Sequence, residues 1–200
     1  MEKSFKEALA NRRSFYALTG SSPVPDKEIE DIIVFAANNV PSAFNSQTTR
    51  MVLLLGENHK ALWNIVKETL KKIVPEQAYS KTEQKIDNSF ASGYGTVLFF
   101  EDGTTIKKLE TEFPLYKDNL KNWSQQTSGM HQLVVWTMLE NAGFGVSLQH
   151  YNPLIDEEVR KKWNLPADWV LIGQMPFGKP LDVPRKKELQ PIEKRVKIFK

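Results

Sequence analysis

The stretch WSQQTSGMHQLVVWTMLENA, residues 123–142, is the most hydrophobic helical segment of the sequence. Its apolar side chains recur at helical spacing on one stripe, which consists of Val134, Val135, Met138, Leu139 and Ala142. Gly143 follows directly, and glycine is common where a helix ends. We therefore predict a helix over these residues and place it, buried, at the centre of the fold.

Four short apolar runs outside that helix predict β-strands. In chain order they are MVLLL (51–55), GTVLFF (95–100), FGVSLQ (144–149) and WVLIGQM (169–175). The sequence Pro-Phe-Gly-Lys-Pro (176–180) follows the last run. We interpret it as a turn, because proline and glycine both interrupt regular structure.

Helical periodicity marks further segments on either side of these strands. The predicted helices cover residues 2–13, 25–40, 58–74 and 156–163. In 25–40, acidic residues gather in the first turn, where the helix dipole favours them, and Pro41 ends the helix. The stretch 75–92 has mixed polarity, and its sequence is compatible with either a helix or an ordered loop.

Strands and helices follow one another along the whole chain, with no repeat and no Gly/Ser-rich or Pro-rich linker. This pattern predicts a single α+β domain over residues 1–200. The tail, residues 184–200, differs because it is basic and polar and ends in RVKIFK, where Val196 and Ile198 alternate with charged neighbours. A terminal strand needs a sheet edge to pair with. We therefore expect this arm to reach a partner subunit in a homodimer.

Composition excludes several classes of protein. The 200 residues include no cysteine, which excludes a disulfide framework, a thiolate zinc site, an iron–sulfur cluster and a cysteine nucleophile. The net charge of +3 is small for a nucleic-acid binder, so no nucleic-acid partner is expected. No apolar run reaches the ~18 residues that cross a bilayer, and the first residues do not resemble a secretory signal. The expectation is a cytoplasmic protein with no membrane partner.

Common catalytic and nucleotide-binding motifs are also absent. The histidines are His59, His131 and His150, and none lies three or four residues from another, so no metal site is predicted. No Gly-x-Ser-x-Gly elbow of a serine hydrolase occurs. Neither a Walker loop nor a Gly-x-Gly-x-x-Gly fingerprint is present, which excludes nucleotide binding by the usual phosphate loops.

Two polar segments follow the first two predicted helices. Arg12–Ser14 places two guanidinium groups beside a hydroxyl, and such groups bind phosphate oxygens. The alternative, that both arginines only complement the negative end of the helix, stays open. Residues 41–47, PSAFNSQ, offer several amide donors and acceptors but alone are typical of a loop.

Four segments together resemble the nitroreductase family of flavoproteins, in its small branch from bacteria and yeasts. They are Arg12–Ser14, the Pro-Ser-x-x-Asn-x-Gln pattern at 41–47, GFGVSLQHYN at 143–152 and IGQMPFGKP at 172–180. The resemblance implies an α+β nitroreductase-like fold, with a central mixed or antiparallel sheet flanked by helices. It also implies a homodimer that exchanges its C-terminal strand and binds FMN between its subunits.

Residue by residue, the resemblance implies a set of FMN contacts. They are Arg12, Arg13, Ser14, Tyr16, Ser42, Phe44, Asn45, Gln47, Ser147, Leu148, Gln149, His150, Lys187 and Arg195. The first three grip the phosphate and ribityl chain, residues 42–47 approach from the other subunit, and residues 147–150 line the ring near its N5 atom. A cation from the tail completes the phosphate site, with Arg195 preferred to Lys187.

The sequence departs from the family pattern at two places. Tyr16 stands where many members carry a further arginine, which removes one charged contact to the cofactor. Thr48 and Thr49 stand where many members carry Pro-Trp, which alters the floor of the substrate pocket. His150 is a proton donor beside the ring or, as the alternative, a structural hydrogen-bonding group.

The activity that the resemblance implies is a ping-pong reaction. NAD(P)H reduces bound FMN, leaves, and is replaced by a nitroaromatic, quinone or similar flat, electron-poor acceptor. No catalytic residue beyond the flavin is needed, with His150 the one candidate. Several aromatic residues either shape the acceptor pocket or belong to the core, and these are Phe44, Tyr94, Phe99, Phe113 and Tyr116.

Two other functions are compatible with the sequence. One is a flavin-binding sensor or storage protein with little turnover. The other is a basic adaptor that contacts nucleic acid or an acidic partner through residues 184–200. Glu188 and Glu193 interrupt the basic clusters of that tail, which weighs against the adaptor.

Overall fold

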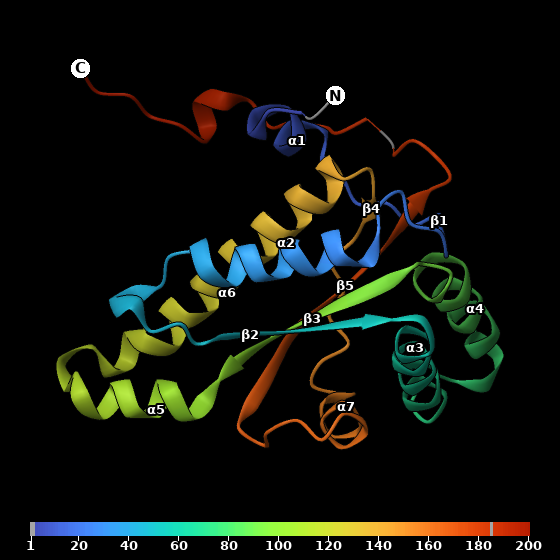
Figure 1. The fold of residues 1–200 in the computed structure, drawn as a ribbon, viewed down its shortest axis with the longest axis horizontal. Helices are drawn as coiled ribbons and strands as arrows, with labels where there is room; N and C mark the ends of the chain where they lie inside the picture. The colour runs from blue at the N-terminus through green and yellow to red at the C-terminus, as the bar shows by residue number, and fades with distance from the viewer. Residues whose placement is uncertain (1–2, 185) are drawn as a thin grey trace.

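A twisted antiparallel sheet forms the middle layer of the fold (Figure 1). The computed structural model describes residues 3–184 and 186–200. The strands are β1 (Leu18–Thr19), β2 (Thr49–Leu55), β3 (Gly95–Asp102), β4 (Gly145–Val146) and β5 (Trp169–Pro180). Their order is β1–β5–β3–β2, and β4 branches from this path by pairing with β5.

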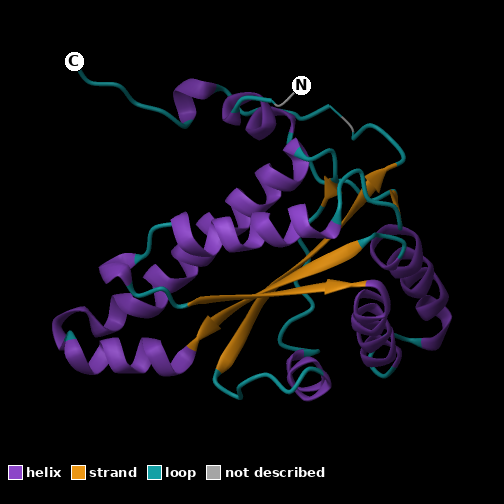
Figure 2. Ribbon diagram, in the orientation of Figure 1, coloured by secondary structure: helices purple, strands orange, loops and turns teal. Residues whose placement is uncertain are grey.

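Helices cover both faces of this sheet (Figures 1 and 2). They are α1 (Phe5–Asn11), α2 (Asp26–Asn39), α3 (Gly56–Lys71), α4 (Glu76–Ile86), α5 (Gly103–Glu112), α6 (Lys117–Asn141) and α7 (Asp156–Lys162). Short helical turns are η1 (Ala43–Asn45), η2 (Asp87–Ala91), η3 (Pro114–Tyr116) and η4 (Ile192–Lys194). The predicted α+β architecture, an antiparallel sheet flanked by helices, is confirmed.

Strand β3 supplies side chains to two separate cores. Val97 and Phe99 pack with α2 and α6 on one face, whereas Leu98 and Phe100 pack with α3, α4 and α7 on the other. All eight residues of β3 are buried. A strand covered on both faces has no side exposed to solvent, which explains its apolar run Val97–Phe100.

The predicted turn at 176–180 is wrong, because β5 continues as a strand through Pro180. The strand is crowded at this point. A Cβ atom added to Gly178 would lie 2.4 Å from the Thr19 carbonyl oxygen on β1, so only glycine allows this close approach. Pro176 lacks an N–H, but its carbonyl oxygen still accepts a bond from the Ser147 N–H at 3.2 Å. Here glycine and proline mark a junction of strands.

The predicted central helix is longer than expected. It begins at Lys117 rather than at Trp123. Helix α5, which had no predicted counterpart, precedes it and is capped by Asp102, whose side chain accepts a bond from the Thr105 N–H at 3.0 Å. The open stretch 75–92 forms α4 and the π-helical turn η2.

Two other predicted elements are shorter in the structure. The run 144–149 forms β4 and an isolated bridge between Gln149 and Gln174, rather than one continuous strand. The first helix covers Phe5–Asn11, and the predicted residue 2 lies outside the described residues. Ser4 starts this helix through a capping box with Glu7.

The tail extends away from the fold past α1 (Figure 1). Apart from η4, its described residues 186–200 form no helix and pair with no strand of the same chain. Val196 and Ile198 are exposed, and residue 185 lies outside the description. Exchange of this segment with a second chain stays a prediction.

Candidate functional site

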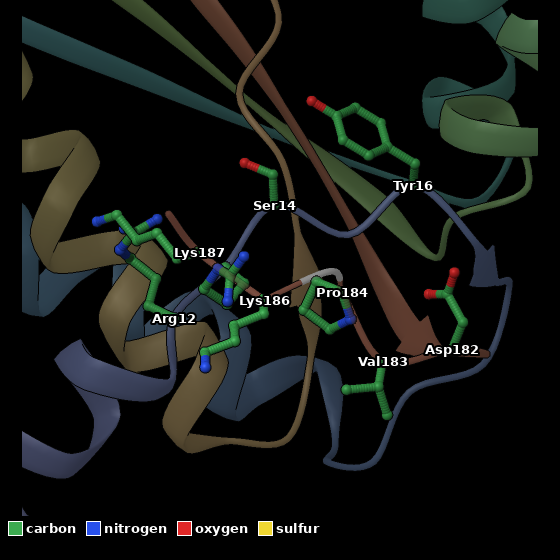
Figure 3. A pocket seen from close by; sticks show the side chains of 9 residues that line it. Arg12, Ser14, Tyr16, Asp182, Val183, Pro184, Lys186 and Lys187 are labelled. Atoms are coloured by element: carbon green, nitrogen blue, oxygen red, sulfur yellow. The ribbon is translucent and has the colours of Figure 1, made fainter. Parts of the chain in front are cut away.

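A basic cleft of about 580 Å³ opens where the segment after α1 meets the segment after β5 (Figure 3). Its lining residues are Arg12, Arg13, Ser14, Tyr16, Asp182, Val183, Pro184, Lys186 and Lys187. The Phe15 N–H donates to the Val146 carbonyl at 3.0 Å, which fixes this segment beside β4. Cations outnumber the single carboxylate in the lining, so the cleft suits an anion.

No carboxylate among the described residues forms an ion pair with Arg12. Its guanidinium group lies over the Trp136 ring on α6, with Cζ 4.4 Å from the ring centroid. Its buried Nε atom has no hydrogen-bond partner among the residues described. Burial and, to a smaller extent, the charge of Arg13 lower the pKa of Arg12. A phosphate group would counter both effects, so these residues fit the anionic end of a cofactor.

The tail contributes two lysines to this cleft. Lys187, the second sequence candidate, lies at the same end of the cleft as Arg12 (Figure 3). Arg195, the preferred candidate, does not line the cleft and is exposed at the end of η4. Sequence reasoning missed Lys186, although the basic run PRKKEL (184–189) was the signal for it.

Tyr16 and Asp182 line the cleft away from this basic end (Figure 3). The Tyr16 ring is half exposed and meets the Phe90 ring edge-on, with centroids 6.3 Å apart. Tyr16 therefore supplies a ring face to the cleft, in place of the charge that an arginine would bring.

The 147–150 segment continues from the basic cleft along β5. Its backbone is fixed, because Gln149 N–H donates to the Gln174 carbonyl at 2.7 Å and the reciprocal bond measures 2.9 Å. The Gln149 side-chain amide donates to the buried Ser147 hydroxyl at 3.1 Å. Since Val146 is bonded to the segment that carries Ser14, one chain brings together Arg12–Ser14 and residues 147–150.

His150 ends this segment at a second, polar pocket of about 360 Å³, called here the His150 pocket. Its lining residues are Gln125, Gly129, Gln132, His150, Asn152 and Ile172. Gln174, which is fully buried, shapes the chain beyond His150. Its side-chain oxygen accepts from the Tyr151 N–H at 2.7 Å, and its amide donates to the Asn152 side-chain oxygen at 3.3 Å. Gln174 is a positioning residue that sequence reasoning missed.

The 42–47 loop lies elsewhere and has a strained backbone. Phe44, Asn45 and Gln47 have φ angles of 56°, 52° and 48°, which non-glycine residues rarely adopt. The Ser42 hydroxyl accepts from the Gln47 N–H at 2.9 Å. Arg50 donates to the Gln47 carbonyl at 2.6 Å and pairs with Asp102 at 2.6 Å. The side chains of Asn45 and Gln47 are exposed.

An aromatic cluster holds this loop against α6. The Phe44 ring stacks on Phe113, with centroids 4.5 Å apart and planes 9° apart, and it also contacts Tyr116 and Trp123. A pocket of about 340 Å³ adjoins the cluster and is lined by Ala43, Phe44, Trp123, Gln126, Thr127 and Met130. The other two proposed pocket aromatics lie apart, since Phe99 is in the core and Tyr94 packs on Phe177.

The loop and the His150 pocket use different faces of α6. With about 100° of rotation per residue, the α6 residues of the two pockets lie on faces roughly 140° apart. The loop contacts the N-terminal half of α6, whereas Arg12 contacts Trp136 in its C-terminal half. One chain therefore does not bring residues 42–47 into the site that it builds from Arg12–Ser14 and residues 147–150.

The remaining histidines are structural. His59, which is buried, contacts the Thr96 hydroxyl at 2.9 Å through Nδ1 and the Ala91 carbonyl at 3.2 Å through Nε2. Because a carbonyl only accepts, Nε2 carries the proton. Burial lowers the pKa of His59 to about 4. The buried His131 bonds the Thr127 carbonyl on its own helix, and burial lowers its pKa as well.

Two absences apply to residues 3–184 and 186–200. No group of three or more His, Asp or Glu side chains is placed there to hold a metal ion. In the same part of the chain, no helix combines the length and the apolar character needed to span a bilayer.

A protein-family profile and a protein from yeast both match most of this chain. A profile described as the nitroreductase family matches residues 9–179. The Saccharomyces cerevisiae protein HBN1 is 33% identical over 198 residues, which cover 98% of this chain and 97% of the relative.

Solved structures resemble the whole chain. Nitroreductase CinD from Lactococcus lactis, in complex with chloramphenicol, is 40% identical with a TM-score of 0.90, covering 98% of this chain and 100% of CinD. The CinD complex with 4-nitrophenol is 41% identical with a TM-score of 0.89, and it again covers 98% of this chain and 100% of CinD. A protein from Exiguobacterium sibiricum solved with FMN shares the fold alone, at 16% identity and a TM-score of 0.71 over 98% of each chain.

Proposed function

This chain belongs to the nitroreductase family, and on that premise we propose that it is an FMN-dependent oxidoreductase acting from NAD(P)H on electron-poor aromatic acceptors. The observation that carries the proposal is that one chain joins the segment lining the basic cleft to Val146 by a backbone hydrogen bond, and that residues 147–150 lead from there to the His150 pocket. The chain thus provides cations at the cleft and a polar pocket at His150. A flavin mononucleotide has a matching division into a phosphate and a flat ring.

In this proposal, Arg12, Arg13 and Ser14 bind the phosphate, and Lys187 adds a cation from the tail. Support comes from the Nε atom of Arg12, which is buried without a partner in the described chain, and from the lowered pKa of its guanidinium. Trp136 keeps that guanidinium in one orientation. Charge-assisted bonds from rigid positions are the strongest contacts a protein can offer to a phosphate.

Residues 147–150 would orient the ring. Their backbone is hydrogen-bonded to β5, so the surface they offer is preorganised. Bound FMN supplies the two-electron chemistry, while the protein supplies position and electrostatics. His150 is exposed at the end of this surface, where it can hold a proton for the acceptor. Reductant and acceptor would use the same open pocket in turn, as a ping-pong reaction requires.

The complete site would need two chains. The 42–47 loop lies on another face of α6, so its Asn45 and Gln47 amides would reach the flavin of the partner subunit in a homodimer. Exposed apolar side chains on α1, α2 and α6 support such an interface, and they include Phe5, Leu9, Val34, Phe35, Met130 and Leu133. In the same dimer, residues 184–200 would act as an arm that reaches the partner.

The acceptors would be nitroaromatics, quinones or similar flat compounds. CinD, which is 40–41% identical, was solved with 4-nitrophenol and with chloramphenicol. The aromatic cluster around Phe44 and the amide-lined His150 pocket offer the ring faces and donors that such compounds bind.

A visible spectrum and an anaerobic titration test this proposal. We expect the purified protein, incubated with FMN and freed of excess, to keep flavin absorption and to lose it on addition of NADPH or NADH. Addition of 4-nitrobenzoate should restore the absorption. Protein that retains no flavin would contradict the proposal at its base. Flavin that stays oxidised with both nucleotides would favour the sensor or storage alternative.

A further inference from the structure

Gly129 is an unexpected residue at the midpoint of α6, a helix of 25 residues. Glycine is the poorest helix former after proline, so it weakens a helix in which it has no task. A Cβ atom added to Gly129 would meet nothing within 4 Å. By contrast, a Cβ atom at Gly178 or Gly95 would collide with neighbouring atoms. Packing within the chain therefore explains those glycines but not Gly129.

The surroundings of Gly129 point to a ligand. Gln125 and Gln132 lie one turn before and one turn after it on the same face of α6, and all three line the His150 pocket. Gln132 donates one amide hydrogen to the Ser128 hydroxyl at 3.2 Å and keeps the other. The Gln125 side chain has no hydrogen-bond partner among the described residues. The helix thus offers a bare central patch between two amide donors.

We propose that Gly129 determines what the His150 pocket admits, because its missing side chain leaves the α6 wall flat. A planar ring system would lie against Gly129, and its carbonyl or nitro oxygens would accept hydrogen bonds from Gln125 and Gln132. This inference rests on the proposed function and adds the wall opposite residues 147–150. The ring system is the isoalloxazine of FMN or the acceptor, and both carry such oxygens.

The variant Gly129→Ala distinguishes a ligand-binding role of Gly129 from a structural one, because it should raise the stability of the protein and lower its affinity for the ligand. Alanine strengthens the helix and finds free space, so the melting temperature of the apoprotein should rise by about 3 °C. The added methyl group would stand in the ring's place. Ligand affinity should then fall about tenfold.

Two measurements show whether the ring that lies against Gly129 belongs to FMN or to the acceptor. Quenching of flavin fluorescence gives the FMN dissociation constant, and steady-state rates give the KM for 4-nitrobenzoate. A weaker FMN complex assigns the wall to the flavin. Unchanged FMN binding with a raised KM assigns it to the acceptor. Gln125→Leu should weaken the same ligand about fivefold, since it removes one amide donor.

Asn64→Ala on α3 is the matched control, because this exposed residue also gains helix propensity but lies outside the pocket. It should raise the melting temperature and leave both ligand constants unchanged. A Gly129→Ala protein with unchanged FMN binding and unchanged KM would overturn the inference, as would an effect confined to dimer dissociation. Wild-type protein that binds no FMN would instead overturn the proposed function, so the two failures are distinguishable.

Discussion

The two faces of α6 support two different parts of the proposed site. On one face, the His150 pocket adjoins residues 147–150, whose backbone is hydrogen-bonded to β5. On the other face, the 42–47 loop rests on aromatic stacking and on the pair between Arg50 and Asp102. The first part is built into the sheet, whereas the second is a loop fixed by side chains.

This difference has an energetic side. Each positive φ angle in the loop costs on the order of 1–3 kcal/mol. The loop keeps this conformation because the Phe44 ring has a stacked partner and the Gln47 carbonyl has a cationic donor. The part built on β5 has no comparable strain among its described residues. We expect changes at the loop to alter ligand affinity through geometry, and changes at the basic cleft to alter it through charge.

Charge reversal at Arg12 should cause the largest loss of FMN affinity. Arg12→Glu removes a cation and places a carboxylate against the phosphate, so FMN affinity should fall at least about 100-fold. Fluorescence quenching measures the dissociation constant. Lys6→Glu, an exposed residue on α1 outside the cleft, is the control and should leave the constant within about twofold. If both variants lost FMN affinity equally, the loss would reflect the net charge of the protein and would contradict a phosphate site in the basic cleft.

Protonation of His59 tests a region remote from both faces of α6. Its folded pKa, about 4, lies below the unfolded value near 6.5, so the folded state binds fewer protons. Its contribution is fully present above pH 6.5 and is lost as the pH falls from 6.5 towards 4. The total is at most about 3 kcal/mol. Urea unfolding across this range should show the slope in the wild type and a smaller slope in His59→Gln, and equal slopes would contradict the assignment.

Loss of the aromatic stack should be the next largest effect. Phe44→Leu keeps an apolar side chain but removes the contact that offsets the backbone strain, so FMN affinity should fall about tenfold. The melting temperature of the apoprotein should change little, because Phe44 is half exposed. Phe113→Leu removes the other ring of the stack and should weaken FMN similarly. Wild-type affinity in both variants would show that the cluster does not support the site.

Asn45 should give the smallest effect, because it tests a single amide. Asn45→Ala should lower FMN retention about fivefold without unfolding the core. Asn45→Gly removes the same amide but tolerates the φ angle of 52°, so the difference between the variants measures the strain. Retention equal to the wild type in both would contradict the proposed place of the loop.

The fold could be predicted where periodicity and burial agree. Val135 and Leu139 mark the apolar stripe of α6, and both are fully buried. The start of the helix was missed, because the stretch from Lys117 to Asn122 has few apolar residues to show a period. The strand through 176–180 was missed as well, since close approach to β1 requires the glycine that local rules assign to a turn.

The candidate site could be predicted only as a set of segments. The order of motifs identified Arg12–Ser14 and residues 147–150, and the structure brings these two together. Residues that act through geometry left no local signal. Trp136 lies under Arg12 only because α1 packs near the end of α6, and Gln174 was one polar residue in a strand. The strained backbone of the 42–47 loop is held in place by aromatic rings more than sixty residues away in the chain, such as Phe113.

Subunit mixing tests the central claim, that each flavin site combines the basic cleft of one chain with the 42–47 loop of another. Arg12→Glu chains would be refolded at equal concentration with chains carrying Phe44→Ala, Asn45→Ala and Gln47→Ala, and bound FMN would be measured. Half of the dimers would then be mixed, each with one intact and one doubly defective site, so about a quarter of all sites should recover FMN. No recovery above the separate variants would contradict the claim, because a site contained in one chain would stay defective in every molecule.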